Sequence, residues 1–208
     1  MMNWQVRRHQ VGIAGWVVDG ATGKPVAGAG VEITAMPAAF KERLKQVSLS
    51  YGKRWTRVVE RPDRTCTRPD GLFYFLDLPD GNYTLRAAIP SFGSRYGKVQ
   101  QPAVVSHDAK GNTRVAFVKC ALQPTAVKGQ ITGSGHKSGV VLAEVRVKGS
   151  GERTFTDAQG LYAVTGIELG NRTLLVHAQG YRSESLAVAL KEPGASETRN
   201  FNLTRESG

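Results

Sequence analysis

The feature that most constrains the fold is an internal repeat, which is found at two different offsets. Gly15 matches Gly129 at an offset of 114 residues, and this match continues without a gap to residue 33. Further on, residues 64–73 match residues 153–162 at an offset of 89. Each copy is long enough to bury a core of its own, so the repeat predicts two domains of the same kind in tandem.

The first copy contains an insertion, because the two offsets differ by 25 residues. The shift falls between Thr34 and Asp63, so the insertion spans residues 35–63. The second copy has no equivalent segment. Any property that depends on the insertion therefore belongs to the first copy alone.

Each copy has the pattern of seven short strands separated by Gly- and Pro-rich turns, such as Pro69-Asp70-Gly71. This pattern is typical of an antiparallel β-sandwich. The predicted domains are residues 1–124 and 125–208. The strands expected in the first are 13–18, 30–35, 64–67, 72–76, 83–89, 99–105 and 114–122. Those expected in the second are 127–132, 143–148, 153–156, 161–167, 172–178, 185–190 and 199–204.

These motifs resemble the carboxypeptidase regulatory-like domain, a transthyretin-like sandwich of seven strands. The first copy carries the resemblance in Gly15, Asp19, Gly23 to Ala29, Asp70-Gly71, Phe73, Phe75, Leu78-Pro79, Gly81, Tyr83 and Leu85. The second carries it in Gly129, Ala143, Thr156-Asp157, Gly160, Tyr162, Gly170 and Gly180-Tyr181. The resemblance implies two tandem transthyretin-like sandwiches. It implies little about function, because such domains are attached to many unrelated proteins.

Two departures from related domains bear on chemistry. Arg86 and Leu175 stand where isopeptide-forming pilin-type domains carry an acid after the Gly-x-Tyr-x-Leu strand. The sequence after Thr204 lacks the Tyr-Arg-Gly-Ser ending of transthyretin-like hydrolases. We therefore expect neither an isopeptide bond nor a hydrolase site.

No other catalytic pattern is visible in the sequence. The four histidines are His9, His107, His136 and His177, and none is paired at metal-ligand spacing. Cys66 and Cys120 form no zinc motif; free thiols are expected, with a single disulfide as the alternative. We predict a protein that is not an enzyme, uses no cofactor or metal, and has no small-molecule substrate.

The chain has a formal net charge of +11, which is unevenly distributed. Residues 1–124 contribute +9 and residues 125–208 contribute +2. An electrostatic partner is therefore expected at the first domain. There is no apolar stretch of about 18 residues to span a membrane and no signal-peptide pattern, so a cytoplasmic location is expected, with release as part of a particle as the alternative.

The insertion predicts a short helix that begins after Pro37. Phe40, Leu44, Val47 and Tyr51 recur at helical spacing and form one apolar stripe. Residues 34–64 hold eight Lys or Arg and three Asp or Glu. The candidate partner-binding residues are Phe40, Lys41, Arg43, Lys45, Tyr51, Lys53, Arg54, Trp55, Arg57 and Arg61.

Three interpretations of this basic insertion compete. It is a helix packed over a sandwich edge with its charges in solvent, a protein-docking element anchored by Trp55 and arginines, or a surface for nucleic acid. The hypothesis favoured for the whole chain is a structural or adaptor protein that makes protein contacts in a larger assembly, such as a phage-tail-like or contractile injection particle. The alternatives are an extracellular module that binds carbohydrate or cell wall, and an accessory subunit of an enzyme.

Overall fold

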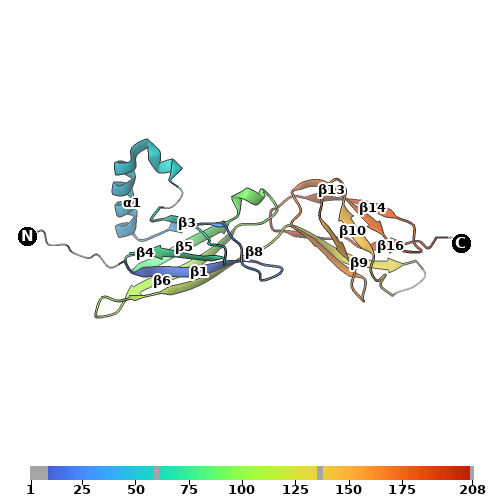
Figure 1. Ribbon diagram of the computed structural model, residues 1–208, viewed down its shortest axis with the longest axis horizontal. Helices are drawn as coiled ribbons and strands as arrows, with labels where there is room; N and C mark the ends of the chain where they lie inside the picture. Colours follow the sequence, from blue (N-terminus) through green and yellow to red (C-terminus); the bar gives the residue numbers. More distant parts are fainter. Residues whose placement is uncertain (1–8, 59–60, 135–137, 207–208) are drawn as a thin grey trace, which may run out of the picture. The chain divides into compact units, whose positions relative to one another are not determined.

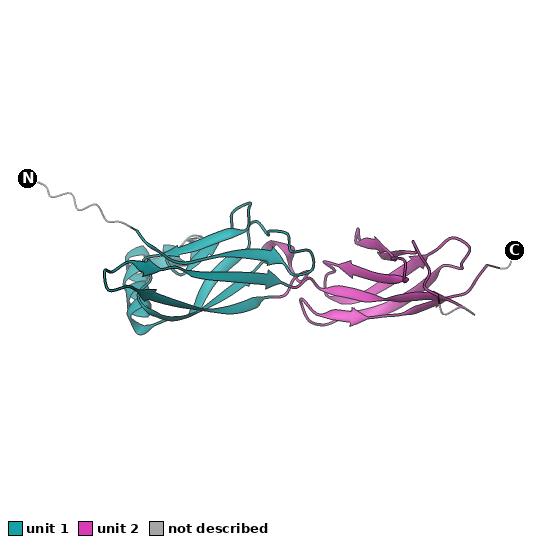
Figure 2. Cartoon of the chain, turned by 90° about the horizontal axis from the view of Figure 1, so that it is seen from below, with its two compact units in different colours: residues 1–90, 98–122 teal, residues 91–97, 123–208 magenta. Residues whose placement is uncertain are grey.

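The computed structural model describes residues 9–58, 61–134 and 138–206, and it divides the chain into two compact units (Figure 2). The first unit comprises the chain to Pro90 together with Lys98–Leu122. The second comprises Ser91–Gly97 and the chain from Gln123. The short segment 91–97 thus comes from within the first half of the sequence but belongs to the second unit.

The first unit is a sandwich of two sheets, with strand orders β4-β1-β8 and β3-β2-β5-β6-β7 (Figure 1). Its strands are β1 (Val11–Asp19), β2 (Gly30–Ala35), β3 (Arg64–Cys66), β4 (Leu72–Leu76), β5 (Gly81–Ala88), β6 (Val99–His107), β7 (Thr113–Arg114) and β8 (Ala116–Leu122). A short 3-10 turn, η2 (Pro90–Phe92), follows β5. The all-β sandwich expected from the strand pattern is confirmed.

The second unit has the same arrangement of sheets. Its strand orders are β12-β9-β15, with β16 also on β9, and β11-β10-β13-β14. Its strands are β9 (Ala126–Gly133), β10 (Glu144–Val147), β11 (Arg153–Phe155), β12 (Leu161–Thr165), β13 (Gly170–His177), β14 (Glu184–Leu190), β15 (Ser196–Thr198) and β16 (Phe201–Leu203). The central strands β1 and β9 therefore occupy equivalent positions in their units.

The sheets differ from the expected pattern in one respect. The sequence predicted antiparallel sheets, but β1 pairs in parallel with β8, and β9 pairs in parallel with β15 and β16. The strand expected at residues 114–122 is divided, because Arg114 lies in β7 on β6 whereas β8 pairs with β1. In the second half, β16 lies within the expected strand 199–204, and the additional strand β15 precedes it.

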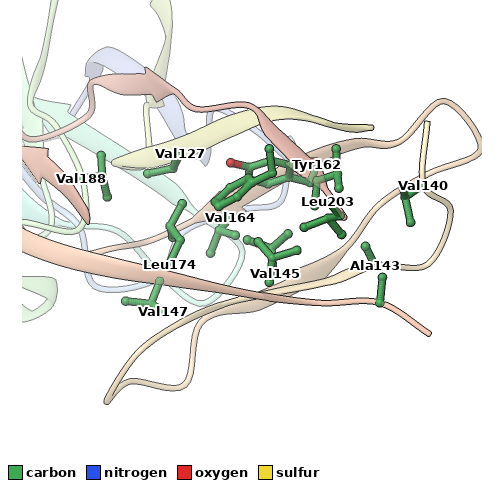
Figure 3. Close-up of a cluster of buried hydrophobic side chains, with 14 of the residues drawn as sticks. Val127, Val140, Ala143, Val145, Val147, Tyr162, Val164, Leu174, Val188 and Leu203 are labelled. Carbon is green, nitrogen blue, oxygen red and sulfur yellow. The ribbon is translucent and has the colours of Figure 1, made fainter. Parts of the chain in front are cut away.

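Each unit has its own hydrophobic core, because alternate side chains of facing strands point inward. In the first unit Ile13, Val31, Leu85 and Leu122 are fully buried. In the second, Val127, Val145, Leu174 and Leu203 are buried with Tyr162 among them (Figure 3).

A buried threonine makes the same two hydrogen bonds in both units. Thr67 Oγ1 accepts a bond from the Ala29 N–H at 2.9 Å and donates one to the Val26 carbonyl at 2.6 Å. Thr156 Oγ1 does the same with Ala143 N–H at 2.8 Å and the Val140 carbonyl at 2.6 Å. The partners are related by the offsets of 89 and 114 residues seen in the sequence. The internal repeat is thus reproduced as a repeat of tertiary hydrogen bonds.

The insertion forms α1 (Ala38–Tyr51) followed by the 3-10 turn η1 (Gly52–Arg57). Figure 1 shows it standing over the side of the first unit near β3 and β4. The predicted helix is present, but its stripe is buried only in its first half. Phe40 and Leu44 are buried, whereas Tyr51 is 50% exposed. Phe40 contacts the ring of Tyr83 edge to face, with centroids 5.9 Å apart.

Segment 91–97 is bonded into the second unit through Ser94 and Arg95. Ser94 Oγ accepts a hydrogen bond from the Leu169 N–H at 2.9 Å. Arg95 pairs with Glu152 and donates to the Gly166 carbonyl at 3.0 Å. The pair raises the pKa of Arg95. Burial acts to raise the pKa of Glu152, but hydrogen bonds from Ser150 and Arg95 outweigh it, so that pKa lies below its ordinary value.

Candidate binding groove on the first unit

The residues predicted to bind a partner separate into an anchor and an exposed surface. Phe40 is fully buried and fixes the helix to the sandwich, so it is not available to a partner. The residues exposed to solvent are Lys41, Lys45, Tyr51, Lys53, Arg54 and Arg57. Arg43, Trp55 and Arg61 are half-buried. The insertion therefore presents basic side chains to solvent while its first turn is held in place.

Trp55 holds two of its neighbours in an ordered cluster. The Tyr51 and Trp55 ring centroids lie 5.8 Å apart, and the Arg61 guanidinium carbon lies 4.7 Å from the Trp55 ring centroid. Arg61 also meets the buried Asp63, with Nε and Oδ1 3.1 Å apart. A guanidinium stacked on a ring and fixed by a carboxylate has little rotamer freedom left to lose on binding.

Beside this cluster lies a groove of 490 Å³ between strands β3 and β4. One wall is the whole of β4, from Leu72 to Leu76, and the other includes Arg64 to Cys66 of β3. Arg43 and Arg61 of the insertion and Arg68 of the β3–β4 turn complete the lining. Four arginines from three chain segments thus converge on one groove.

The four arginines differ in the hydrogen bonds and ring contacts that their guanidinium groups already make. Arg43 donates to the carbonyl of Asp77 at 2.7 Å. Arg68 donates to the Tyr74 hydroxyl at 3.1 Å, with its guanidinium carbon 5.1 Å from the centroid of that ring. Among the described residues, Arg64 has no side-chain hydrogen bond or ion pair. Arg64 is therefore the guanidinium most available to an anionic ligand.

Among the described residues that line the groove, Asp77 is the carboxylate that reduces its positive charge. Burial acts to raise the pKa of Asp77, but hydrogen bonds from the Gln10 backbone N–H and His9, together with the nearby charge of Arg43, outweigh it and lower that pKa. Asp77 is therefore ionised at neutral pH. The carboxylate of Asp63, in turn, forms an ion pair with Arg61. With Arg61 balanced by Asp63, the three other arginines outnumber Asp77 and leave the groove positive.

The matching edge of the second unit lacks this charge. Arg153 occupies the position of Arg64 but lies 3.5 Å from Glu144, and Asp157 replaces Arg68. Arg43 and Arg61 have no counterpart because the insertion is absent. The sandwich fold itself therefore does not require arginines at these positions.

Sequence reasoning found Arg43 and Arg61 but missed Arg64, Arg68 and Tyr74. Arg64 and Arg68 lie in the repeated block, where Arg64 matched Arg153 and so was interpreted as part of the fold. A signal was present at residue 68, because the repeat replaces Arg68 by Asp157. Lys41, Lys45, Lys53, Arg54 and Arg57 do not line the groove.

A second exposed surface adjoins the groove on the outer face of sheet β4-β1-β8. Trp16 and Phe117 stack with centroids 6.2 Å apart, and Tyr74 lies across Ala14 from Phe117 in the sheet register. Trp16 is 43% exposed and Phe117 71% exposed. Tyr74 belongs to both surfaces, since it also lines the groove.

One row of hydrogen-bonded side chains resembles a catalytic triad, but its hydrogen bonds run in the wrong direction. His107 Nδ1 contacts Asp80, and its Nε2 lies 2.9 Å from Thr113 Oγ1. Thr113 Oγ1 is also 2.8 Å from the Gln10 side-chain oxygen, which can only accept a hydrogen bond. The Thr113 hydroxyl thus donates to Gln10, and His107 is not its base.

The described part of the chain contains no group of three or more His, Cys, Asp or Glu side chains placed to hold a metal ion. His136 lies outside the described residues. Cys66 and Cys120 are both free thiols. Within the described ranges, no helix has the length and apolar character needed to cross a membrane.

Several solved structures are similar to this chain at low sequence identity and low TM-score. A structure of the Bacillus anthracis TIE protein has a TM-score of 0.37 and 16% identity, and the match covers 94% of this chain and 34% of that one. The streptococcal ancillary pilin has a TM-score of 0.37 and 14% identity, with 95% of this chain and 62% of that one covered. The shaft pilin SpaA of Lactobacillus rhamnosus GG has a TM-score of 0.40 and 12% identity, with coverage of 96% and 98%.

This chain therefore spans only about a third of the TIE protein chain. At identities and TM-scores this low, the similarity does not extend to function or partners. No curated protein matches the sequence.

The family comparison is more specific. The model of the CarboxypepD_reg-like domain matches residues 127–207, which is most of the second unit. That the first unit is a second copy of the same family stays a prediction, supported by its matched strand order and threonine bonds. The match to residues 127–207 agrees with the resemblance to the carboxypeptidase regulatory-like domain seen in the sequence of the second copy.

Proposed function

We propose that this chain is a non-enzymatic binding protein whose first unit holds an acidic segment of a protein partner within a larger assembly. The observation that carries the proposal is the convergence of Arg43, Arg61, Arg64 and Arg68 on one groove. Arginine suits this task because its planar guanidinium binds a carboxylate through two parallel hydrogen bonds.

The distribution of charge supports a contact made by the first unit. Most of the positive charge lies in residues 1–124, and the groove arginines have no equivalent set in the second unit. Two of the arginines are held against aromatic rings, so that they are positioned before a ligand arrives. Preorganised side chains of this kind lower the entropic cost of association.

The assembly in which this contact is made is proposed to be a phage-tail-like or contractile injection particle. A cytoplasmic location stays part of the same proposal. In this account the second unit acts as a spacer or as a second point of contact. The carbohydrate-binding and enzyme-accessory alternatives remain as outcomes of the test below.

Nucleic acid is a second candidate ligand because of one specific observation. Exposed Lys53, Arg54 and Arg57 lie next to Tyr51 and Trp55, and aromatic rings among basic side chains are typical of single-strand binding. Trp55, however, is already covered on one side by Arg61. That ring face is not free to stack on a base, so the protein ligand is favoured.

The test is the size of the complex that the chain forms in the cells that make it. We expect the tagged wild-type chain to sediment in a large protein complex that survives nuclease treatment. The double variant Arg64→Glu/Arg68→Glu should sediment as free chain of 22.5 kDa. Arg153→Glu, at the matched position in the second unit, is the control and should stay in the complex.

Three outcomes would contradict the proposal. The wild-type chain could sediment as a free monomer, the complex could dissociate with nuclease, or the groove variant could remain bound. A monomer that binds glycan would favour the carbohydrate alternative. A complex lost with nuclease would favour the nucleic-acid one.

A further inference from the structure

We propose that the acidic segment binds as an added β-strand, with its backbone hydrogen-bonded to the free edge of β4. This inference rests on the proposed function and specifies how the same groove is used. It concerns the chemistry of the partner segment, which is extended and carries carboxylates at alternate positions.

The edge of β4 that faces the groove is unpaired in the described structure. Strand β4 pairs with β1 on one side, in the register Ala14 with Tyr74 and Gly15 with Phe73, and has no partner strand among the described residues on the other. Next to the strand, Val17 N–H donates to the Gly71 carbonyl at 2.9 Å. Backbone N–H and C=O groups alternate in direction along a strand. The backbone groups of Phe73 and Phe75 therefore face β1, and those of Tyr74 and Leu76 point toward the groove.

At the start of this edge, the backbone groups of Leu72 are already hydrogen-bonded to the turn that precedes β4. Leu72 N–H donates to the Asp70 carboxylate at 3.0 Å, and the Leu72 carbonyl accepts from the Arg68 N–H at 2.9 Å. The free donors and acceptors of the edge therefore begin at Tyr74. An added strand would pair from Tyr74 toward Asp77, at the end of the groove where Arg43 lies.

The groove supplies positive charge beside such a strand. Arg61 and Arg64 come from the insertion and β3, across the groove from β4, while Arg68 lies over the ring of Tyr74. Successive side chains of a strand point to opposite faces. Carboxylates at every second position therefore meet arginines on one face, and the residues between them lie beside Tyr74 and Leu76.

A protective role for the arginines is the simplest competing explanation. Proteins often place charge, mainly lysine, on free strand edges to prevent pairing with other chains. Gatekeeping charges of this kind need no fixed geometry. Arg61 and Arg68 are instead stacked and hydrogen-bonded, and Arg64 is left without a partner among the described residues. This arrangement is suited to receiving carboxylates.

Cys66 provides a natural way to test the mode of binding in the intact chain. Its side chain lines the groove and is half-buried, whereas Cys120 is fully buried. A synthetic peptide of alternating Glu and Val, joined through a Gly-Ser linker to a terminal cysteine, is equilibrated with the protein in a thiol–disulfide buffer. A peptide with Lys in place of Glu competes with it, and mass spectrometry measures the two mixed disulfides.

We expect the acidic adduct to exceed the basic adduct by about tenfold or more. The preference should reverse in Arg64→Glu/Arg68→Glu and nearly disappear in Arg64→Gln/Arg68→Gln, which keeps a folded variant available if charge reversal disturbs the fold. Cys66→Ser should form no adduct. Equal yields of the two peptides on the wild-type chain would overturn both the charge-based function and this inference.

Backbone methylation separates strand addition from charge attraction alone. Two further acidic peptides carry N-methyl groups on alternate amides, one on the odd and the other on the even residues. Because an added strand turns only one edge to β4, one peptide should lose most of its advantage over the Lys peptide and the other should keep it. Equal behaviour of the two, with the acidic preference retained, would overturn strand addition and leave the proposed function standing.

Discussion

Gly15 and Gly129 occupy the same position on the central strand of their units, and each is there for steric reasons. A Cβ on Gly15 would lie 2.1 Å from the Val118 carbonyl oxygen, and one on Gly129 would lie 1.7 Å from that of Arg199. In both units the obstructing carbonyl belongs to the parallel strand segment at the end of the domain. The glycine therefore permits the parallel pairing that the sequence pattern did not predict.

Gly15→Ala is predicted to lower the free energy of unfolding of the first unit by about 3 kcal/mol or more, because backbone must shift to admit the methyl group. Denaturant unfolding of the intact chain measures this effect. Gly151→Ala is the matched control, since a Cβ there meets nothing within 4 Å, and it should change stability by less than about 0.5 kcal/mol. An equally small effect of Gly15→Ala would contradict the steric explanation.

Because the thiol of Cys120 is buried, we predict that the first unit loses stability at alkaline pH. Burial raises the pKa of its thiol from 9.0 to about 11, so that above pH 9 the unfolded chain releases a proton that the folded chain keeps. Stability is therefore complete below pH 9 and falls by about 2–3 kcal/mol as the pH rises to 11. Burial also raises the pKa values of Tyr83 and Tyr162 to about 12, which adds a loss that begins near pH 10.

Cys120→Ala should remove the decline that begins at pH 9 and keep the one that begins near pH 10. Urea midpoints measured at intervals from pH 7 to pH 11 test this. A wild-type midpoint that stays constant across that range would contradict the buried-thiol assignment.

At the scale of elements, helix α1 shows how a surface insertion is fixed by its first turn. Phe40 fills a buried site against Tyr83, whose hydroxyl donates to the Pro79 carbonyl at 2.7 Å. In the second unit Arg172 occupies the position of Tyr83 and donates to the equivalent carbonyl of Glu168 at 3.0 Å. The same backbone group is bonded in both units, but only the tyrosine offers a ring to an overlying helix.

Phe40→Ala is predicted to destabilise the first unit by about 3 kcal/mol, as is usual for removal of a buried aromatic side chain. Because α1 and its continuation place Arg43 and Arg61, binding of acidic peptide should fall as well. Thermal unfolding and peptide titration measure the two effects. Leu49→Ala, at a position of the same helix that is 73% exposed, serves as the control and should leave both unchanged. A stable Phe40→Ala chain with full peptide binding would contradict the anchor role.

From the ion pair of Arg95 with Glu152, we predict that segment 91–97 stabilises the second unit. Arg95→Gln leaves Glu152 without its ion pair and should cost about 1–2 kcal/mol at neutral pH, since the pair is partly exposed. The pKa of Glu152 is lowered in the folded state, so this contribution is present above its ordinary pKa of 4.5 and is lost as the pH falls through the lowered value. The cost of the substitution should therefore decrease in acid.

The matched control is Arg153→Gln, because its ion pair with Glu144 spans 3.5 Å and the arginine side chain is 68% exposed. It should cost less than about 0.5 kcal/mol at any pH. Chemical denaturation at neutral and acid pH compares the two variants. Equal costs for Arg95→Gln and Arg153→Gln at neutral pH would contradict the role of the segment.

For the whole molecule, periodicity and turns predicted the strands and the helix well, because each depends on nearby residues. The repeat offsets predicted an insertion at residues 35–63, and α1 and η1 lie within that range. Two features could not be predicted from the sequence, because they depend on contacts between residues that are distant along the chain. The parallel pairing of β1 with β8 joins the two ends of the first unit, and the 91–97 segment is placed by Arg95 and Ser94 bonds to residues far along the chain.

The groove was only half predictable for the same reason. The charge of the insertion is visible in the sequence, but the meeting of Arg43 and Arg61 with Arg64 and Arg68 arises only when β3 and β4 separate into different sheets. The +9 charge of residues 1–124 indicated the half of the chain in which the groove lies. It did not identify which of the basic residues share a surface.

The most direct test of the arginine groove is a titration of a fluorescent peptide of alternating Glu and Val with the intact chain. Fluorescence anisotropy is followed at low and at physiological salt. We predict salt-sensitive binding that weakens by about tenfold or more, or ~1.4 kcal/mol, in Arg64→Glu/Arg68→Glu. The control Arg146→Glu/Arg153→Glu makes the same change of charge in the second unit and should bind as the wild type does. Equal loss in both variants, or no binding by the wild-type chain, would contradict the account.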